Sequence, residues 1–391
     1  MTYNFNEIVQ RDNTNSLKYD FANRCGKPEG LLPLWVADMD FKTPAPVVEA
    51  LVEKSKHGIF GYSESGQDYF FILKDWFKTN FEWDIRPDWL VKTPGVVYAI
   101  ATAIRGMTVK GDGILIQQPV YYPFSEIIRI NERKLVVNQL VYEKGRYIID
   151  FDDFENKIST NGVKLFILCN PHNPVGRVWT KEELTRLGDI CLKHQVTVIS
   201  DEIHQDFIYP GHKHLVFADL KPEFLKISIT CTAPTKTFNL AGLQISNIFI
   251  KDRELRKKFV DEMTKSGYNE LNVMGLVACT AAYSQGREWL NELKTYLVGN
   301  LDFMRNFLSE KLPQIKLVEP EGTYLVWLDF NELGLSEKEL EDLIINKAGL
   351  WLDEGIMFGA GGEGFQRINI ASPRVILEQA LTQLEQAINS L

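Results

Sequence analysis

The sequence has little of what marks membrane, secreted or nucleic-acid-binding proteins. No uninterrupted apolar run in its 391 residues approaches the ~18 residues that a membrane span requires, so we expect no contact with a membrane. The opening residues, Met1 to Asn13, are mostly polar and include Glu7 and Arg11, and we expect no signal peptide. With 43 Lys and Arg against 52 Asp and Glu, the net charge of -9 disfavours nucleic acid as a partner.

Cysteine and histidine are also scarce. The five cysteines are odd in number and widely spaced, which argues against a disulfide framework and favours the reducing cytoplasm. His212 and His214 lie close together, but no further ligands are spaced nearby, so we expect no metal site. The run from Gly359 to Gly364 matches G-x-G-x-x-G. A strand pattern follows it where a dinucleotide-binding site needs a helix, so we reject that interpretation.

The middle of the chain alternates short apolar runs with segments of helical period, which is typical of βαβ units. We expect strands at 113–117, 164–169, 196–200 and 227–231. The second and third have apolar cores on both faces, as strands of a parallel sheet covered by helices do. Thr180 and Glu183 form a capping-box pattern, which predicts a helix over 181–194.

The pattern changes after about Gln285. Long charged helical stretches such as 286–311 are followed by candidate strands at 322–330 and 365–371. We therefore predict an α/β fold with two domains. A large domain with a mostly parallel sheet spans 49–285, and a smaller α+β domain combines 1–48 with 286–391.

Polar residues cluster where the predicted strands end, which is the edge at which open α/β sheets bind ligands. Lys236 follows one strand and Asp201 follows another. Taken singly, Lys236 would be read as a surface lysine and Asp201 as a helix cap. Together, a lysine able to form a Schiff base and a carboxylate able to face a cationic ring nitrogen are the pair that pyridoxal phosphate requires.

Three ordered motifs carry a family resemblance. Asn170 to Gly176 reads NPHNPVG, Ser200 to His204 reads SDEIH, and Thr235 to Gly242 reads TKTFNLAG. They resemble the aspartate aminotransferase (fold type I) superfamily of pyridoxal-phosphate enzymes, whose fold implies a seven-stranded large-domain sheet. The stretches 35–41 and 119–124 are similar to the MalY/PatB/cystalysin group of cystathionine β-lyases (C-S lyases), and the likeness extends from residue 4 to 373.

The resemblance implies a role for each motif residue. Lys236 would hold the cofactor covalently, and Asp201 would face its ring nitrogen. Asn173 would donate a hydrogen bond to the phenolic oxygen of the ring. Tyr122 would stack on the ring, with Tyr121 close by on the substrate side.

The resemblance also implies how the phosphate is held. The residues expected to contact the phosphate are Val96 and Val97 at a helix start, Thr235 and Thr232 through their hydroxyls, and Tyr62 from a neighbouring subunit. A homodimer with shared active sites follows. His204 lies one helix-like turn beyond Asp201, a spacing that favours support of that carboxylate over simple packing. The chain departs from the superfamily pattern at Ala233, where many members have serine, and at Gln244, where aminotransferases commonly have a phosphate-binding arginine.

For the substrate, the resemblance places a carboxylate-binding arginine at Arg367, assisted by the main chain of Ala37. The implied reaction is α,β-elimination of L-cystathionine or related L-cysteine conjugates to a thiol, pyruvate and ammonia. Aminotransfer remains the alternative, because composition and spacing do not separate the two reactions. A second role as a regulator of a transcription factor also stays open, although no sequence feature identifies a surface for it.

Overall fold

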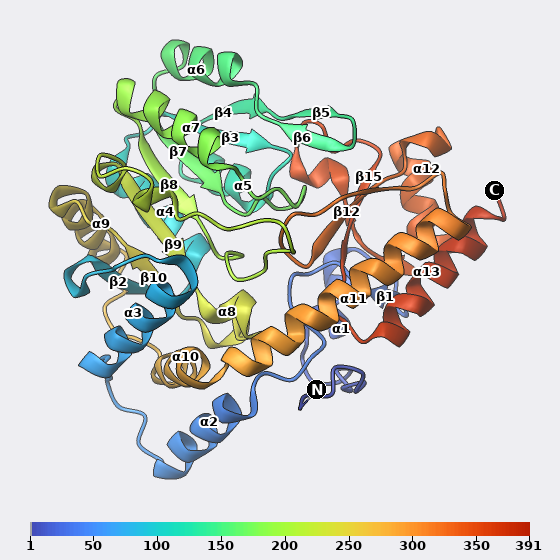
Figure 1. Ribbon diagram of the computed structural model, residues 1–391, viewed down its shortest axis with the longest axis horizontal. Coiled ribbons are helices and arrows are strands. Elements are labelled where there is room, and N and C mark those ends of the chain that lie inside the picture. Colours follow the sequence, from blue (N-terminus) through green and yellow to red (C-terminus); the bar gives the residue numbers. More distant parts are fainter. Residues whose placement is uncertain (1) are drawn as a thin grey trace.

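The computed structural model describes residues 2–391 and contains a seven-stranded and a four-stranded sheet surrounded by helices (Figure 1). The larger sheet has the strand order β2-β10-β9-β8-β7-β3-β4. Its strands are β2 (Leu90–Thr93), β3 (Gly113–Gln118), β4 (Lys134–Gln139), β7 (Val163–Cys169), β8 (Thr197–Asp201), β9 (Ser228–Thr232) and β10 (Ser246–Phe249). Pairing is parallel from β4 to β9, and β10 runs antiparallel to both its neighbours. The predicted mostly parallel seven-stranded sheet is confirmed.

Helices cover both faces of this sheet, which explains its apolar strands. Side chains alternate between faces along a strand. Leu115 and Phe166 pack on one side with α6 (Phe151–Thr160) and α7 (Lys181–Lys193). Ile116 and Ile167 pack on the other. The helices on that second side are α4 (Val96–Met107), α5 (Pro123–Ile130) and α9 (Arg253–Lys265).

Helix α7 begins as its sequence predicts. The backbone N–H of Glu183 donates to Thr180 Oγ1 at 3.2 Å, and the Thr180 N–H donates back to the Glu183 carboxylate at 2.8 Å. This reciprocal capping satisfies two N–H groups that would otherwise lack a partner. The four predicted strands lie within one residue of β3, β7, β8 and β9.

The four-stranded sheet is antiparallel and lies in the C-terminal part of the chain. Its order is β11-β12-β15-β14, with β11 (Lys316–Val318), β12 (Leu325–Asp329), β14 (Asp353–Glu354) and β15 (Phe365–Asn369). β1 (Leu32–Pro33) pairs in parallel with β13 (Leu350–Trp351), so the N-terminal segment lies against this part of the chain. The division into 49–285 and 1–48 with 286–391 stays a prediction, and Met1 lies outside the described residues.

The other elements complete the shell around the sheets. α11 is the long helix, with 25 residues from Arg287 to Lys311. The remaining α-helices and strands are α1 (Leu17–Asp20), α2 (Ala45–His57), α3 (Gln67–Phe81), α8 (Pro234–Thr237), α10 (Val273–Gln285), α12 (Glu337–Asp342), α13 (Arg374–Ile388), β5 (Val141–Glu143) and β6 (Arg146–Ile148). Within residues 2–391, no helix combines the length and apolar character that a membrane crossing requires.

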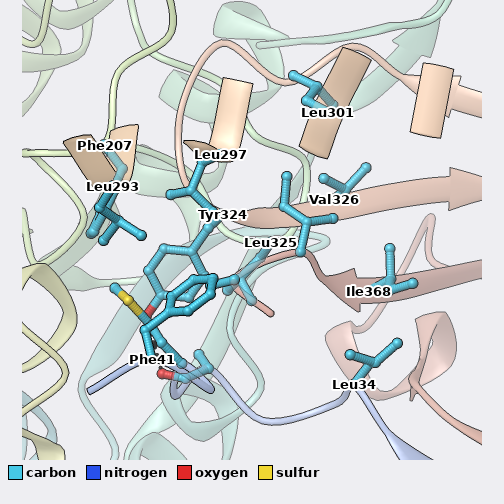
Figure 2. Close-up of a cluster of buried hydrophobic side chains, with 14 of the residues drawn as sticks. Leu34, Phe41, Phe207, Leu293, Leu297, Leu301, Tyr324, Leu325, Val326 and Ile368 are labelled. Atoms are coloured by element: carbon cyan, nitrogen blue, oxygen red, sulfur yellow. Dashed lines mark hydrogen bonds between the residues drawn. The ribbon is translucent and has the colours of Figure 1, made fainter. Parts of the chain in front are cut away.

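A buried cluster joins segments that are far apart in the sequence. Figure 2 shows the ring of Tyr324 near Phe41, Phe207 and Leu297. Tyr324 lies directly before β12, and the other three come from the N-terminal segment, the loop after β8 and helix α11. The cluster therefore fixes the N-terminal segment beside the larger sheet, where the candidate site lies.

The packing of α7 on its neighbour makes Gly188 sensitive to substitution. A Cβ built there would lie 2.2 Å from Cζ of Phe224, a fully buried ring that stacks on Phe217. We expect Gly188→Ala to lower the free energy of unfolding by about 1–3 kcal/mol, because the buried ring has to move. Unfolding by urea, followed by circular dichroism, measures this.

Gly299→Ala, on helix α11, is the matched control. Its Cβ would meet only the flexible end of the Arg374 side chain, at 3.2 Å. It should be neutral or stabilising, since alanine favours a helix over glycine by up to about 1 kcal/mol. Equal urea midpoints for Gly188→Ala and the wild type would contradict the packing described here.

Candidate active site

The candidate active site lies where the central strands of the larger sheet end. β8 ends at Asp201, the loop after β7 carries Asn173, and β9 leads into α8, which carries Lys236. Because β7, β8 and β9 are parallel neighbours, their carboxyl ends meet at one edge. The structure thus brings together the three residues that the sequence motifs single out.

Lys236 points toward the N-terminal segment. Its side chain is partly buried, and Nζ donates a hydrogen bond to the carbonyl oxygen of Ala37 at 2.7 Å. The hydroxyl of Tyr324 donates to the same oxygen at 3.2 Å. Desolvation lowers the pKa of Lys236 to about 8, and the nearby Arg367 acts in the same direction. The amine is therefore much more often neutral near physiological pH than an exposed lysine.

Asp201 is buried, and few hydrogen bonds or cations stabilise the charge of its carboxylate. One carboxylate oxygen accepts the Ile203 N–H at 3.2 Å, and among the described residues no cation forms an ion pair with it. Burial raises its pKa to about 7, and the charge of Glu202 adds to the rise. A cationic group of a ligand placed against this carboxylate would therefore be strongly favoured.

The neighbouring Glu202 is different, because its partners lie inside the protein. Its carboxylate accepts from Ser200 Oγ at 2.7 Å and from the Phe217 N–H at 3.1 Å. His214 Nε2 lies 2.9 Å from its other oxygen. Of two adjacent acids, only Asp201 is left open to a ligand.

Arg367 lies on β15 and is held by three groups. Its Nη1 donates to Asn173 Oδ1 at 3.0 Å, and Nη2 donates to the Trp35 carbonyl at 2.8 Å. Nη2 also forms a buried ion pair with Asp353, the residue opposite it on β14. Its Nε is buried and has no hydrogen-bond partner among the described residues. The guanidinium thus keeps a free donor while its orientation is fixed.

Aromatic rings surround this region. The backbone N–H of Tyr121 donates to the Asn173 carbonyl at 3.0 Å, which ties the two segments together. The rings of Tyr121 and Tyr122 lie 5.6 Å apart, and Tyr122 meets Phe358 edge to face at 6.0 Å. Burial raises the pKa of the Tyr121 hydroxyl, so this phenol stays protonated over the physiological range.

Of the residues predicted to contact the phosphate, four lie on helices α4 and α8 and on strand β9. Val96 and Val97 form the first turn of α4, whose N-terminus is suited to an anion. Thr235 is buried in α8. The hydroxyl of Thr232, another expected contact, donates instead to the Asn247 carbonyl at 2.8 Å, inside the sheet.

Two predicted residues have no contact that bears on their roles. Tyr62 is 94% exposed. His204 packs its ring edgewise on Tyr324, and its buried Nδ1 has no partner among the described residues. Burial lowers the pKa of His204 to about 3, so the imidazole is neutral. Both roles stay predictions.

The residues present fit pyridoxal phosphate. The cofactor has an aldehyde, a ring nitrogen that can carry positive charge, a phenolic oxygen and a phosphate. Lys236 supplies an amine of lowered pKa, and Asp201 is a buried carboxylate that forms no ion pair with the described residues. Because Arg367 occupies Oδ1 of Asn173, the amide nitrogen of that side chain is the group left to donate. The N-terminus of α4 suits the phosphate.

Sequence reasoning missed the side chains that hold this site in place. Asn239 donates to the carbonyls of Met39 and Phe41 and accepts the Met39 N–H. Asn369 donates to the carbonyls of Val36 and Asp38. Asn369 lies two residues after Arg367 and therefore on the same strand face, a signal that could have found it. Asp353 had no comparable signal, because its partner lies on another strand.

The two rejected motifs have structural explanations. The glycine run 359–364 leads into β15 and not into a helix, as its context predicted. His214 is engaged with Glu202, and His212 is exposed in a turn. Among residues 2–391, no cluster of three His, Cys, Asp or Glu side chains could hold a metal ion.

Fold and site together define a protein with a reactive lysine and a carboxylate at the edge of a doubly covered parallel sheet. Residues 30–384 match the family model for aminotransferase class I and II, and the chain belongs to this family. It is 43% identical over 386 residues to cystathionine beta-lyase PatB of Bacillus subtilis, covering 99% of this chain and all of that protein. It is 31% identical to protein MalY of Escherichia coli, with each chain covered completely.

A solved structure also matches the chain over its full length. Cystalysin from Treponema denticola, which contains a pyridoxal 5'-phosphate cofactor, superposes with a TM-score of 0.96 and 38% identity, and both chains are fully covered. The resemblance to the MalY/PatB/cystalysin group is thereby confirmed over essentially the whole chain.

The shifted pKa of Asp201 predicts a pH dependence of stability in the cofactor-free protein. The pKa is about 7 in the folded chain against an ordinary value of 3.8. The contribution of Asp201 to the free energy of unfolding is therefore fully present below about pH 4 and is lost as the pH rises through 7. Relative to the wild type, Asp201→Asn should gain up to about 4 kcal/mol of unfolding free energy between pH 4 and 8.

Urea unfolding at several pH values measures this difference. Asp75→Asn, which changes an exposed acid on α3, is the matched control and should not reproduce the trend. A difference between Asp201→Asn and wild type that stays constant with pH would show that Asp201 titrates like an exposed acid.

Proposed function

We propose that this protein is a pyridoxal-phosphate-dependent C-S β-lyase. It would cleave L-cystathionine or related L-cysteine conjugates by α,β-elimination to a thiol (homocysteine or hydrogen sulfide), pyruvate and ammonia. The observation that carries this proposal is the full-length match to the cystathionine beta-lyase PatB, in a chain where Lys236, Asp201 and Arg367 share one site. Aminotransfer is the alternative that the assay below separates.

Arg367 binds the α-carboxylate of the substrate in this proposal. Its guanidinium keeps the unpaired Nε donor, while Asp353, Asn173 and the Trp35 carbonyl hold it in place. A fixed planar fork suits a carboxylate, which can accept two parallel hydrogen bonds. The main chain of Ala37 is close by, because its carbonyl accepts the Lys236 hydrogen bond.

Lys236 has two tasks in this proposal: it anchors the cofactor, and its Nζ later takes the proton from the substrate's α-carbon. The second task requires a neutral amine, which a pKa of about 8 makes accessible near physiological pH. When bound, pyridoxal phosphate supplies a cationic ring that accepts the electron pair released by that proton transfer. The Ala37 carbonyl orients the amine through its hydrogen bond.

Asp201 and Asn173 hold the charge state that the reaction needs. The Asp201 carboxylate would keep a proton on the ring nitrogen, because it is buried and forms no ion pair with a side chain of the described residues. The Asn173 amide donates to the phenolic oxygen. Tyr122 supplies an aromatic face for the ring, and Tyr121 lies beside it on the substrate side.

The protein also acts as a cytoplasmic homodimer in this proposal. The five cysteines are free and four of them are buried, which suits a reducing compartment. Ile59, Phe60 and Tyr62 are exposed together on one segment, as expected of residues that a second subunit covers. Tyr62 would then reach the phosphate of the neighbouring site.

The decisive assay supplies L-cystathionine to the holoenzyme without any keto-acid acceptor. We expect homocysteine, pyruvate and ammonia in equal amounts. Lys236→Ala should lower turnover by at least ~10³-fold, because both the anchor and the base are lost. Lys265→Ala, at an exposed position on α9, is the control. A strict requirement for an acceptor would establish the aminotransferase instead.

Arg367→Lys tests carboxylate recognition. Loss of the planar fork should raise KM for L-cystathionine about 10- to 100-fold, while kcat changes less, because the interaction exists before the chemical step. Steady-state kinetics of both constants measure this. Arg305→Lys, on the exposed side of α11, should leave KM unchanged. An unchanged KM for Arg367→Lys would assign the carboxylate to another residue.

A further inference from the structure

A second cavity of about 600 Å³ lies outside the site described above. Its walls are the loop after β8 (205–214), the C-terminal end of α3 and the first half of α11. Lys236, Asp201 and Arg367 are not part of its lining. A volume of this size is within the usual range for small-molecule sites.

One wall of the cavity carries acceptors. Asp206 is 5% exposed, and its two carboxylate oxygens accept from Trp76 Nε1 at 3.1 Å and from Thr237 Oγ1 at 2.7 Å. These bonds leave lone pairs on both oxygens. Gln205, 2% exposed, also lines the cavity, and its Oε1 has no hydrogen-bond partner among the described residues. Burial raises the pKa of Asp206, while the Thr237 hydrogen bond and the charge of Lys294 act to lower it, so a ligand cation in direct contact would stabilise the charged form further.

The facing wall carries cations from α11. Arg287 and Lys294 are seven residues apart, two helical turns, and both line the cavity. Arg287 is held by Asn80 Oδ1 at 2.7 Å and lies over the Trp76 ring at 4.7 Å. Among the described residues, no carboxylate lies within ion-pair distance of Lys294. Its charge acts on the Asp206 carboxylate only from beyond that distance, which leaves the Lys294 ammonium without a direct carboxylate partner.

The walls formed by α3 and α11 also carry apolar side chains. Phe81, Leu290 and Leu297 line the cavity together with the polar residues named above. A ligand that satisfies all three features has an ammonium group, a carboxylate and an apolar side chain. This is the chemistry of a free α-amino acid.

Two chains of contacts connect this cavity to Lys236. Asp206 accepts from Thr237, the residue after Lys236 on α8. Phe207 packs edge to face on Tyr324 at 4.9 Å, and Tyr324 donates to the Ala37 carbonyl that also holds Lys236 Nζ. Asp206 is thus bonded to the residue after Lys236, and its chain neighbour Phe207 begins the second set of contacts. We propose that the cavity binds a free α-amino acid and that its occupancy changes turnover at Lys236.

The binding test uses holoenzyme in which borohydride has reduced the bond between the cofactor and Lys236. This blocks exchange of amino acids at the active site and requires no turnover. L-Methionine is the probe, because it has an unbranched apolar side chain and no leaving group on its β-carbon. Calorimetry should detect one site per chain, and Lys294→Met should weaken binding at least tenfold.

Lys311→Met, at an exposed position near the end of the same helix, is the matched control and should bind like wild type. Butyrate, which lacks the amine, and butylamine, which lacks the carboxylate, should each bind at least tenfold more weakly than methionine. Absence of binding heat, or equal affinity in Lys294→Met, would overturn the proposal. Equal affinity for inorganic phosphate would also overturn it, because the cavity would then be a simple anion site.

The proposed effect of the cavity on turnover is tested separately, by steady-state kinetics, and this test rests on the proposed lyase activity. Methionine that competes at the active site raises KM but leaves kcat at saturating L-cystathionine unchanged. An effect through the cavity should change kcat at least twofold in wild type and in Lys311→Met, and not in Lys294→Met. The same change in all three proteins would refute the coupling. Failure of the lyase proposal would leave the calorimetric result intact, so the two outcomes are distinguishable.

Discussion

The candidate active site depends on one buried carboxylate that the folded chain does not neutralise. Asp201 and Glu202 are adjacent, yet Glu202 is satisfied by Ser200, His214 and a backbone N–H, while Asp201 receives a single backbone N–H. Burial of such a group is unfavourable unless it takes up a proton or meets a cation. The fold therefore holds a position where binding of a cationic ring removes an electrostatic cost.

The N-terminal segment is the second support of the site, since it orients both reactive cations. The Ala37 carbonyl fixes the Lys236 amine, and the Trp35 carbonyl fixes the Arg367 guanidinium. Asn239, after α8, and Asn369, on β15, in turn hold this segment by its backbone. Because one segment is bonded both to the α8 region, which follows β9 of the larger sheet, and to β15 of the smaller sheet, the spacing of Lys236 and Arg367 depends on how these two parts meet. A shift between them would change the two contacts together.

The sequence predicts local features and motifs well, because each depends on residues close together in the chain. The short apolar runs of the strands, the capping box at Thr180 and the polar residues after β8 and β9 are of this kind. Sequence could not predict the Ala37 carbonyl as the partner of Lys236, about 200 residues away, because a backbone oxygen carries no signature. It also could not show which of Asp201 and Glu202 lacks a partner. That distinction arises only from tertiary packing.

The segment that follows β8 explains how one stretch of chain can serve two sites. Asp201 faces the active site, whereas Gln205 and Asp206 line the cavity beside α11. Turns within the segment hold these groups in a fixed relation, through hydrogen bonds from the Gln205 N–H to the Glu202 carbonyl and from the Phe207 N–H to the His204 carbonyl. Displacement of Asp206 is therefore transmitted along the backbone as well as through Thr237. Since Phe207 packs in the same cluster as Tyr324 and Leu297, a change in the cavity reaches the Lys236 amine through packed side chains, without rearrangement of the sheet (Figure 2).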